Sequence, residues 1–243
     1  MTSFVIKIIA ALTMIIDHMG LMLLPHMDIF RIIGRLAFPI YAYCIAEGFR
    51  YTRNRLKYFL QIFILGVLCQ VVYTIVDGVL YLGILITFSI SLVIMYFIDC
   101  LKSAAEGEES HITKLYFSLF KRKLSGRVDL IISATLSAIA IAAAYLLTRY
   151  IEVDYGFFGI LLPVFAAFFD DKPRRLIAFS ACLVALCLVN TSLGDLLQYW
   201  SLLAVPILAV YNGKRGKYRL KYFFYIFYPA HLVLLYAIDY FIM

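Results

Sequence analysis

Two consecutive hydrophobic segments carry ionisable residues at depths where a membrane would tolerate them least. The first, KIIAALTMIIDHMGLMLLP, is long enough to cross a bilayer and holds Asp17 and His18 near its middle. The second, RIIGRLAFPIYAYCIAEGFR, opens with Arg31 and Arg35. An ionised side chain at mid-membrane costs at least about 3 kcal/mol, so it persists only with a partner, with water or for a function. We therefore look for the chemistry of this chain in these segments.

The composition indicates a polytopic membrane protein. Hydrophobic residues make up 64% of the 243 residues and charged residues 15%, against about 45–50% and about 25% in soluble domains. At about 20 apolar residues per span, the sequence predicts an all-α membrane helix bundle of about nine transmembrane helices, forming one domain over residues 1–243. The expected spans are 5–24, 29–49, 58–76, 80–100, 128–149, 155–170, 176–193, 195–211 and 222–241.

Lysine and arginine gather in alternate loops. They concentrate after the second, fourth, sixth and eighth expected spans, at 50–57, 102–127, 172–175 and 214–221. By the positive-inside rule, the N-terminus is cytoplasmic and the C-terminus lies outside. The net charge of +7 then reflects topology, and no nucleic-acid partner is expected. The segment 101–127 is a polar cytoplasmic loop, in which KLYFSLFKRK fits a short amphipathic helix at the inner interface.

His18 is the strongest candidate for a catalytic group, because a neutral imidazole is the usual general base near neutral pH. Adjacent residues of a helix point about 100° apart, so Asp17 is poorly placed to orient the His18 ring. We expect Asp17 to pair instead with Arg31 or Arg35, and we expect Arg35→Ala to leave it unpaired. The pair could be purely structural or could help to bind an anion or carbonyl, and His18 could be a structural histidine.

The ionisable residues form two layers, one in the outer and middle part of the membrane and one on the cytoplasmic side. Tyr155 begins the sixth span on the outer side, and His231 lies near the middle of the last span. The cytoplasmic loops either serve only as topology signals or form a basic rim that binds phosphates. Walker-type and H-E-x-x-H motifs are absent from the sequence, so we expect neither nucleotide hydrolysis nor a metal site. The candidate phosphate-binding residues are Arg50, Arg53, Asn54, Asn212, Lys214 and Arg215.

Five blocks of the sequence are informative together: TMIIDHMG, IGRLAFPIYAYCIAEGFRYTRN, DYGFFGILLP, YNGKRG and KYFFYIFYPAHL. Taken together, they resemble the TraX family, which is named for a membrane protein that acetylates pilin and is similar to other transmembrane acyltransferases. The blocks follow one another over nearly the whole chain, although 101–127 matches none of them.

The resemblance implies a multi-pass acetyltransferase of the bacterial inner membrane that uses acetyl-CoA or another acyl-CoA. His18, with Asp17, would be catalytic, either as the general base or by carrying the acyl group covalently. Arg31, Arg35, Tyr155 and His231 would bind the substrate, and the basic rim would hold the CoA phosphates. The acceptor would be a surface-protein N-terminus, a glycan or another small molecule, with membrane lipids around the protein. A transporter with an Asp/His/Arg site, or a non-catalytic assembly partner for surface polymers, remains an alternative.

Overall fold

The structure, a computed structural model, describes residues 1–78, 80–216 and 221–242. Its contacts form two compact units. Unit 1 comprises Met1–Arg50 and Phe169–Met243, and unit 2 comprises Tyr51–Phe168. The prediction of a single membrane domain stays a prediction.

The predicted all-α membrane architecture is confirmed. Within the described residues, six helices are long and apolar enough to cross a membrane. Three shorter apolar helical segments, at 156–168, 196–209 and 226–241, lie where the sequence predicts the sixth, eighth and ninth spans. The exact number of spans and the sides of the two termini stay predictions. The six long segments are Ser3–Met22, Asp28–Tyr51, Arg55–Ile75, Ile84–Ala105, Gly126–Tyr150 and Lys172–Ser192.

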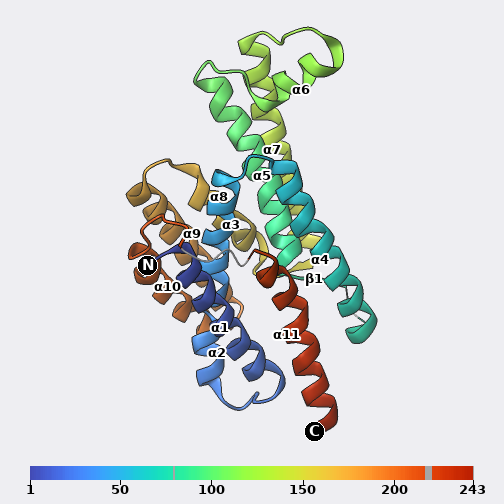
Figure 1. Cartoon of the computed structure of the whole chain (residues 1–243), viewed down its shortest axis with the longest axis vertical. Helices are drawn as coiled ribbons and strands as arrows, with labels where there is room; N and C mark the ends of the chain where they lie inside the picture. The colour runs from blue at the N-terminus through green and yellow to red at the C-terminus, as the bar shows by residue number, and fades with distance from the viewer. Residues whose placement is uncertain (79, 217–220, 243) are drawn as a thin grey trace. The chain divides into compact units, whose positions relative to one another are not determined.

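Unit 1 begins with a tight helical hairpin, drawn in blue in Figure 1. Helix α1 (Ser3–Met22) packs on α2 (Asp28–Gly34), and α3 (Ala37–Tyr51) continues after a two-residue interruption. Pro39 lies in the first turn of α3, where its missing N–H breaks no helical bond. The interruption therefore comes just before Pro39.

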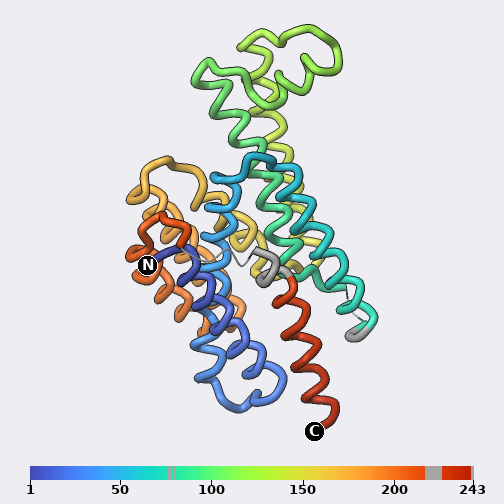
Figure 2. The backbone as a smooth tube through the Cα atoms, viewed as in Figure 1, coloured from blue at the N-terminus to red at the C-terminus, as the bar shows by residue number. Residues whose placement is uncertain are grey.

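The rest of unit 1 comes from the C-terminal part of the chain. Helix α9 (Lys172–Ser192) packs against the 3₁₀ helix η1 (Leu196–Leu203), which continues into α10 (Ala204–Ala209). Helix α11 (Lys221–Ile242) lies beside α1, as Figures 1 and 2 show. The first and last predicted spans are thus neighbours in space.

Unit 2 is built around a long pair of helices. Helix α5 (Ile84–Ala105) contacts α7 (Gly126–Tyr150) along its length, and α4 (Arg55–Asp77) and α8 (Gly156–Phe168) pack on α5. Helix α6 (His111–Phe120) lies in the connection between α5 and α7, at the end of that pair in Figure 2. It agrees with the short amphipathic helix expected in the polar loop.

Unit 2 also contains a short pair of parallel strands. Strand β1 (Tyr81–Leu82) pairs with β2 (Glu152–Val153), directly before α8. The Tyr81 hydroxyl donates to Asp154 Oδ1 at 2.8 Å, and Thr87 Oγ1 donates to the Asp154 carbonyl at 3.1 Å. Burial, and secondarily the charge of Asp154, raises the pKa of Tyr81, which keeps the phenol a neutral donor.

Candidate functional site

The carboxylate of Asp17 on α1 forms an ion pair with Arg31 on α2. Asp17 Oδ1 lies 2.8 Å from Arg31 Nη1, and the side chains are 16% and 20% exposed. Helix α2 can approach because Gly34 faces the carboxylate: a Cβ added there would lie 2.1 Å from Asp17 Oδ1. The sequence therefore places glycine where the acid needs room, and Arg31 supplies its counter-ion.

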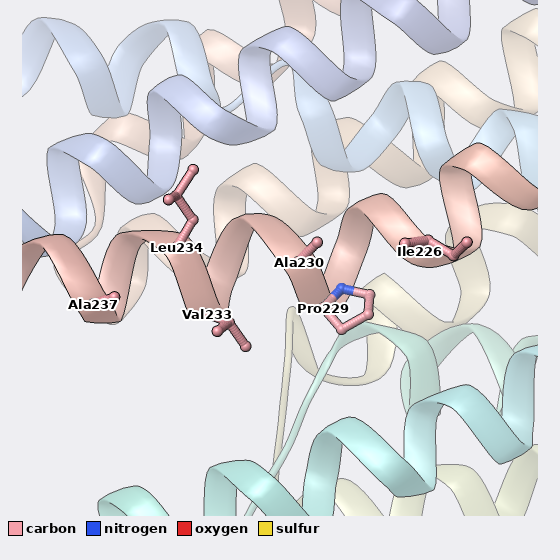
Figure 3. A pocket seen from close by; sticks show the side chains of 6 residues that line it. All are labelled: Ile226, Pro229, Ala230, Val233, Leu234 and Ala237. Atoms are coloured by element: carbon pink, nitrogen blue, oxygen red, sulfur yellow. The ribbon is translucent and has the colours of Figure 1, made fainter.

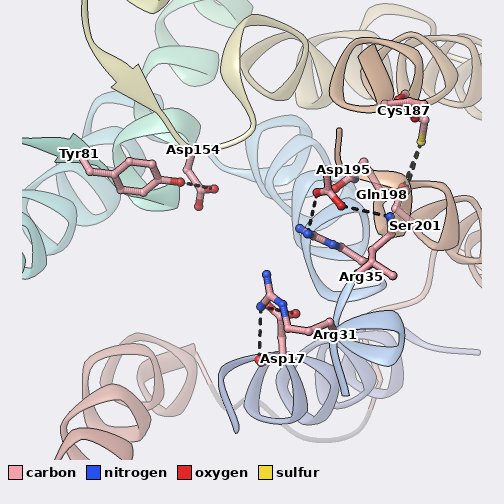
Figure 4. Close-up of polar contacts among 11 residues, drawn as sticks. Asp17, Arg31, Arg35, Tyr81, Asp154, Cys187, Asp195, Gln198 and Ser201 are labelled. Atoms are coloured by element: carbon pink, nitrogen blue, oxygen red, sulfur yellow. Dashed lines mark hydrogen bonds and ion pairs between the residues drawn. The ribbon is translucent and has the colours of Figure 1, made fainter. Parts of the chain in front are cut away.

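Arg35 is not the ion-pair partner of Asp17, although we expected Arg35→Ala to leave Asp17 unpaired. Its Nη2 donates to Asp195 Oδ2 at 2.7 Å, and Asp195 lies in the connection between α9 and η1. That part of the expectation is wrong, because η1 packs on α2 and brings a second carboxylate closer to Arg35. The two ion pairs are near enough for Arg35 and Asp195 to act electrostatically on Asp17, and Figure 4 shows them together.

Two histidines from opposite ends of the chain meet beside this hairpin. His231 Nε2 on α11 lies 3.1 Å from His18 Nδ1 on α1, with ring centroids 4.9 Å apart. Each Nδ1 also faces a carbonyl oxygen four residues earlier on its own helix, that of Met14 at 3.0 Å and that of Phe227 at 2.9 Å. The structure thus brings together two of the residues that the sequence singles out.

Helix α11 has two different faces. His231 and Leu235 are buried, at 6% and 4% exposure. An apolar hollow runs along another face, and Figure 3 shows the six side chains that line it. That face has the chemistry of a lipid-contacting surface, whereas His231 lies on the buried side of the helix. The hollow is lined by Ile226, Pro229, Ala230, Val233, Leu234 and Ala237.

The inner edge of η1 is a polar stripe that the sequence prediction misses. In a 3₁₀ helix, residues three apart lie on one edge, so Asp195, Gln198 and Ser201 align. Gln198 and Ser201 are fully buried, and Cys187 Sγ of α9 lies 3.5 Å from Ser201 Oγ (Figure 4). Neither Nε2 nor Oε1 of the Gln198 side chain has a hydrogen-bond partner among the described residues. An amide inside an apolar segment is the signal that could have identified this stripe.

A second buried ion pair lies between α3 and α9. Arg175 pairs with Glu47, and these side chains are only 6% and 8% exposed. The Tyr211 hydroxyl donates to the other Glu47 oxygen at 3.0 Å, and the guanidinium lies over the Tyr43 ring, 5.1 Å from its centroid. The sequence places Glu47 near the cytoplasmic end of its span, but its partners come from segments more than 100 residues away.

The predicted basic rim is divided between the two units. Arg50 of unit 1 donates to the Phe169 carbonyl at 2.7 Å and so holds the chain near the start of α9. In unit 2, Asn54 caps α4 by accepting from Lys57 N at 2.8 Å, and Arg53 is exposed. Arg50 and Asn54 therefore have structural contacts, whereas Arg53 has no ion-pair partner within the described ranges.

The second basic loop folds onto the N-terminus. Asn212 N donates to the Met1 carbonyl at 2.9 Å, and Ser3 N donates to the Lys214 carbonyl at 2.8 Å. The Asn212 side chain accepts from Lys214 N, which forms a local turn. The side chains of Lys214 and Arg215 remain exposed. Residues 217–220 of this loop lie outside the described residues.

Tyr155 belongs to unit 2, at the start of α8. Its φ of 60° is in the left-handed region, which a bulky side chain rarely adopts. Such backbone strain is concentrated at functional sites, although it does not identify the ligand. No group of three or more His, Cys, Asp or Glu residues that could hold a metal ion occurs among the described residues.

One of the comparisons with known proteins identifies a family. The family model described as "TraX protein" matches residues 3–239. The chain is 26% identical over 255 residues to "Probable fimbrial assembly protein FimC, serogroup H1" of Dichelobacter nodosus, covering 96% of this chain and 94% of that protein. An uncharacterised protein of Rickettsia prowazekii is 39% identical over 70 residues, 29% of this chain and 26% of its own length. No solved structure matches the chain.

Proposed function

Because the chain belongs to the TraX family, we propose that it is an integral membrane acyltransferase, and in the first instance an acetyltransferase. It moves the acyl group of cytoplasmic acyl-CoA to an amine or hydroxyl acceptor at or beyond the outer face of the inner membrane. The observation that carries the proposal is the approach of His18 and His231 to 3.1 Å beside the Asp17–Arg31 ion pair. Ionisable groups inside a membrane bundle are costly, which makes such a cluster the first hypothesis for a functional site.

His18 acts as the general base. The acceptor loses its proton to the imidazole, and its electron pair attacks the thioester carbonyl. The tetrahedral intermediate then collapses, the carbon–sulfur bond breaks, and the departing CoA thiolate takes the proton from the imidazolium. The Asp17–Arg31 pair carries no net charge. It sets the electric field near His18, but it does not stabilise the His18 imidazolium so strongly that the proton cannot leave.

The donor is bound through its phosphates. Lys214 and Arg215 are the best candidates in unit 1, because both side chains are exposed on a loop that is ordered by Asn212 and the N-terminal segment. Arg53 is the corresponding candidate in unit 2. Charge-assisted bonds to phosphate are stronger than neutral ones, which suits a highly charged donor.

The relative of Dichelobacter nodosus suggests the class of acceptor. It is named as a probable fimbrial assembly protein, and it aligns over nearly all of both chains. We therefore propose a surface protein as the first acceptor to test, with a glycan or a small molecule as the other candidates.

Transfer in membrane vesicles tests the proposal. Inverted inner-membrane vesicles from cells that produce the protein would receive acyl-CoA labelled in the acyl group, and label in acid-stable products would be measured. His18→Ala should lower transfer by about 10²–10⁴-fold, the contribution of general-base catalysis. His26→Ala is the matched control, because His26 is exposed in the α1–α2 loop. Transfer by His18→Ala within a few-fold of the wild type would remove His18 from the mechanism.

A further inference from the structure

The contacts of the two paired histidines restrict where their protons can lie. A neutral imidazole has one N–H donor and one nitrogen acceptor, whereas a carbonyl oxygen only accepts. His231 Nδ1 faces the Phe227 carbonyl at 2.9 Å, so it must carry the proton that forms this bond. Its Nε2 then has a lone pair and accepts. The donor to that lone pair is His18 Nδ1, at 3.1 Å.

The opposite assignment leaves unfavourable contacts. If His231 Nε2 carried the proton and donated it to His18, the Nδ1 lone pair of His231 would face the Phe227 oxygen. The Nδ1 lone pair of His18 would likewise face the Met14 oxygen, 3.0 Å away. Two acceptor–acceptor contacts in the bundle would cost more than the single bond gained. With both rings neutral, only the assignment with a proton on each Nδ1 satisfies all three contacts.

This assignment distinguishes the two nitrogens of His18. Nδ1 carries the proton and shares it between the Met14 carbonyl and His231. Nε2 has the lone pair, and it has no hydrogen-bond partner among the described residues. Asp17 does not orient the ring, because its carboxylate is paired with Arg31. The side chain that orients His18, together with the Met14 carbonyl of its own helix, therefore comes from α11, 213 residues away in the sequence.

We propose that His231 is a positioning residue that fixes His18 as its Nδ1–H tautomer, so that His18 Nε2 is the atom that accepts the acceptor's proton. The arrangement follows the logic of a nucleophile, a base and an orienting third group, with a neutral histidine in the third place. When His18 becomes an imidazolium, its bond to His231 Nε2 becomes charge-assisted and stronger. The catalytic part of this role rests on the proposed acyl transfer, but the tautomer does not.

Nitrogen NMR of the wild-type protein in detergent tests the tautomer directly. The chain has four histidines, and ¹⁵N-histidine labelling with His18→Gln and His231→Gln variants assigns the signals of the pair. We expect both Nδ1 atoms to be protonated and both Nε2 atoms to be unprotonated at neutral pH. A protonated His18 Nε2 in the neutral ring would overturn the proposal, whatever the activity of the protein.

Substitutions test the catalytic consequence. His231→Gln keeps an amide oxygen near the position of Nε2, whereas His231→Ala removes the acceptor. We expect His231→Ala to lower kcat by about 10–100-fold, the range found when a group that orients a metal-binding histidine is lost, with the KM for acyl-CoA unchanged. His231→Gln should recover most of that loss. If both variants instead raise the KM for the acceptor with kcat unchanged, His231 binds substrate and the positioning role is wrong.

The two measurements separate the two proposals. If the tautomer is found as expected but the wild-type protein transfers no acyl group, the acyltransferase function fails and the proton assignment stands. If transfer depends on His18 but its Nε2 is protonated in the resting enzyme, the assignment fails alone. His26→Ala should change neither the NMR signals of the pair nor the rate.

Discussion

Replacing Arg31 with Gln should destabilise unit 1, because it would leave the buried Asp17 carboxylate without its counter-ion. The paired atoms are 2.8 Å apart, and the side chains are only 20% and 16% exposed. Breaking a buried pair by removing one partner costs about 3–5 kcal/mol, and partial exposure places this pair near about 3 kcal/mol. At about 2–4 °C per kcal/mol, the unfolding midpoint should fall by about 6–12 °C.

The buried cysteines provide the assay. Cys44, Cys182 and Cys187 are buried in unit 1, whereas Cys69 and Cys100 belong to unit 2. In a Cys69→Ala, Cys100→Ala background, a thiol-reactive dye added during heating in detergent reports the opening of unit 1 alone. Every variant would be scanned at the same rate, since such midpoints depend on the scan rate.

A double substitution identifies the partner. Asp17→Asn with Arg31→Gln removes both charges and should recover most of the lost midpoint. Asp17→Asn with Arg35→Gln should recover none of the midpoint that Arg35→Gln alone loses, because Arg35 pairs with Asp195. The assignment is refuted if Arg31→Gln leaves the midpoint unchanged, or if the Arg35 double variant recovers as much as the Arg31 double variant.

Two further predictions use the same assay. Gly34→Ala should lower the midpoint strongly, because the new Cβ would lie 2.1 Å from Asp17 Oδ1. An unchanged midpoint would contradict the close packing of α1 on α2. Arg175→Ala should cost about 3–5 kcal/mol of stability, because it leaves Glu47 buried without its counter-ion. The control is Arg174→Ala. The Arg174 side chain is exposed and pairs with Asp171 at 3.5 Å, so its loss should cost about 0–1 kcal/mol. Similar losses for the two variants would argue against a structural role for the Glu47–Arg175 pair.

The sequence predicts the membrane helices and the main polar residues well, because hydrophobicity and membrane depth are local properties. Asp17, His18, Arg31 and His231 stand out since each is costly within an apolar segment. What a local pattern cannot give is the partner. The contact between His18 and His231 depends on α11 packing beside α1, and no periodicity in either segment indicates that neighbour.

The partner of Arg35 is missed for the same reason. Arg31 and Arg35 are four residues apart and so seem equally able to reach Asp17. The structure brings η1 against α2, and Asp195 then lies closer to Arg35. The internal face of η1 is missed for a different reason. The predicted span at 195–211 assumes an α-helical period, in which Asp195, Gln198 and Ser201 would turn progressively away from one line, whereas the 3₁₀ period of three aligns them on one edge.

Binding of acyl-CoA to the purified protein tests the proposed activity most directly. The wild-type protein should bind acyl-CoA, and the affinity should fall as salt rises, because phosphate contacts are electrostatic. Lys214→Gln and Arg215→Gln should each lose about 1.5–3 kcal/mol of binding, roughly ten- to a hundredfold, if each donates a charge-assisted bond. Acyl-pantetheine, which lacks the nucleotide, should bind these variants and the wild-type protein equally. A folded wild-type protein that binds no acyl-CoA at low salt would contradict the assignment as an acyl-CoA-dependent transferase.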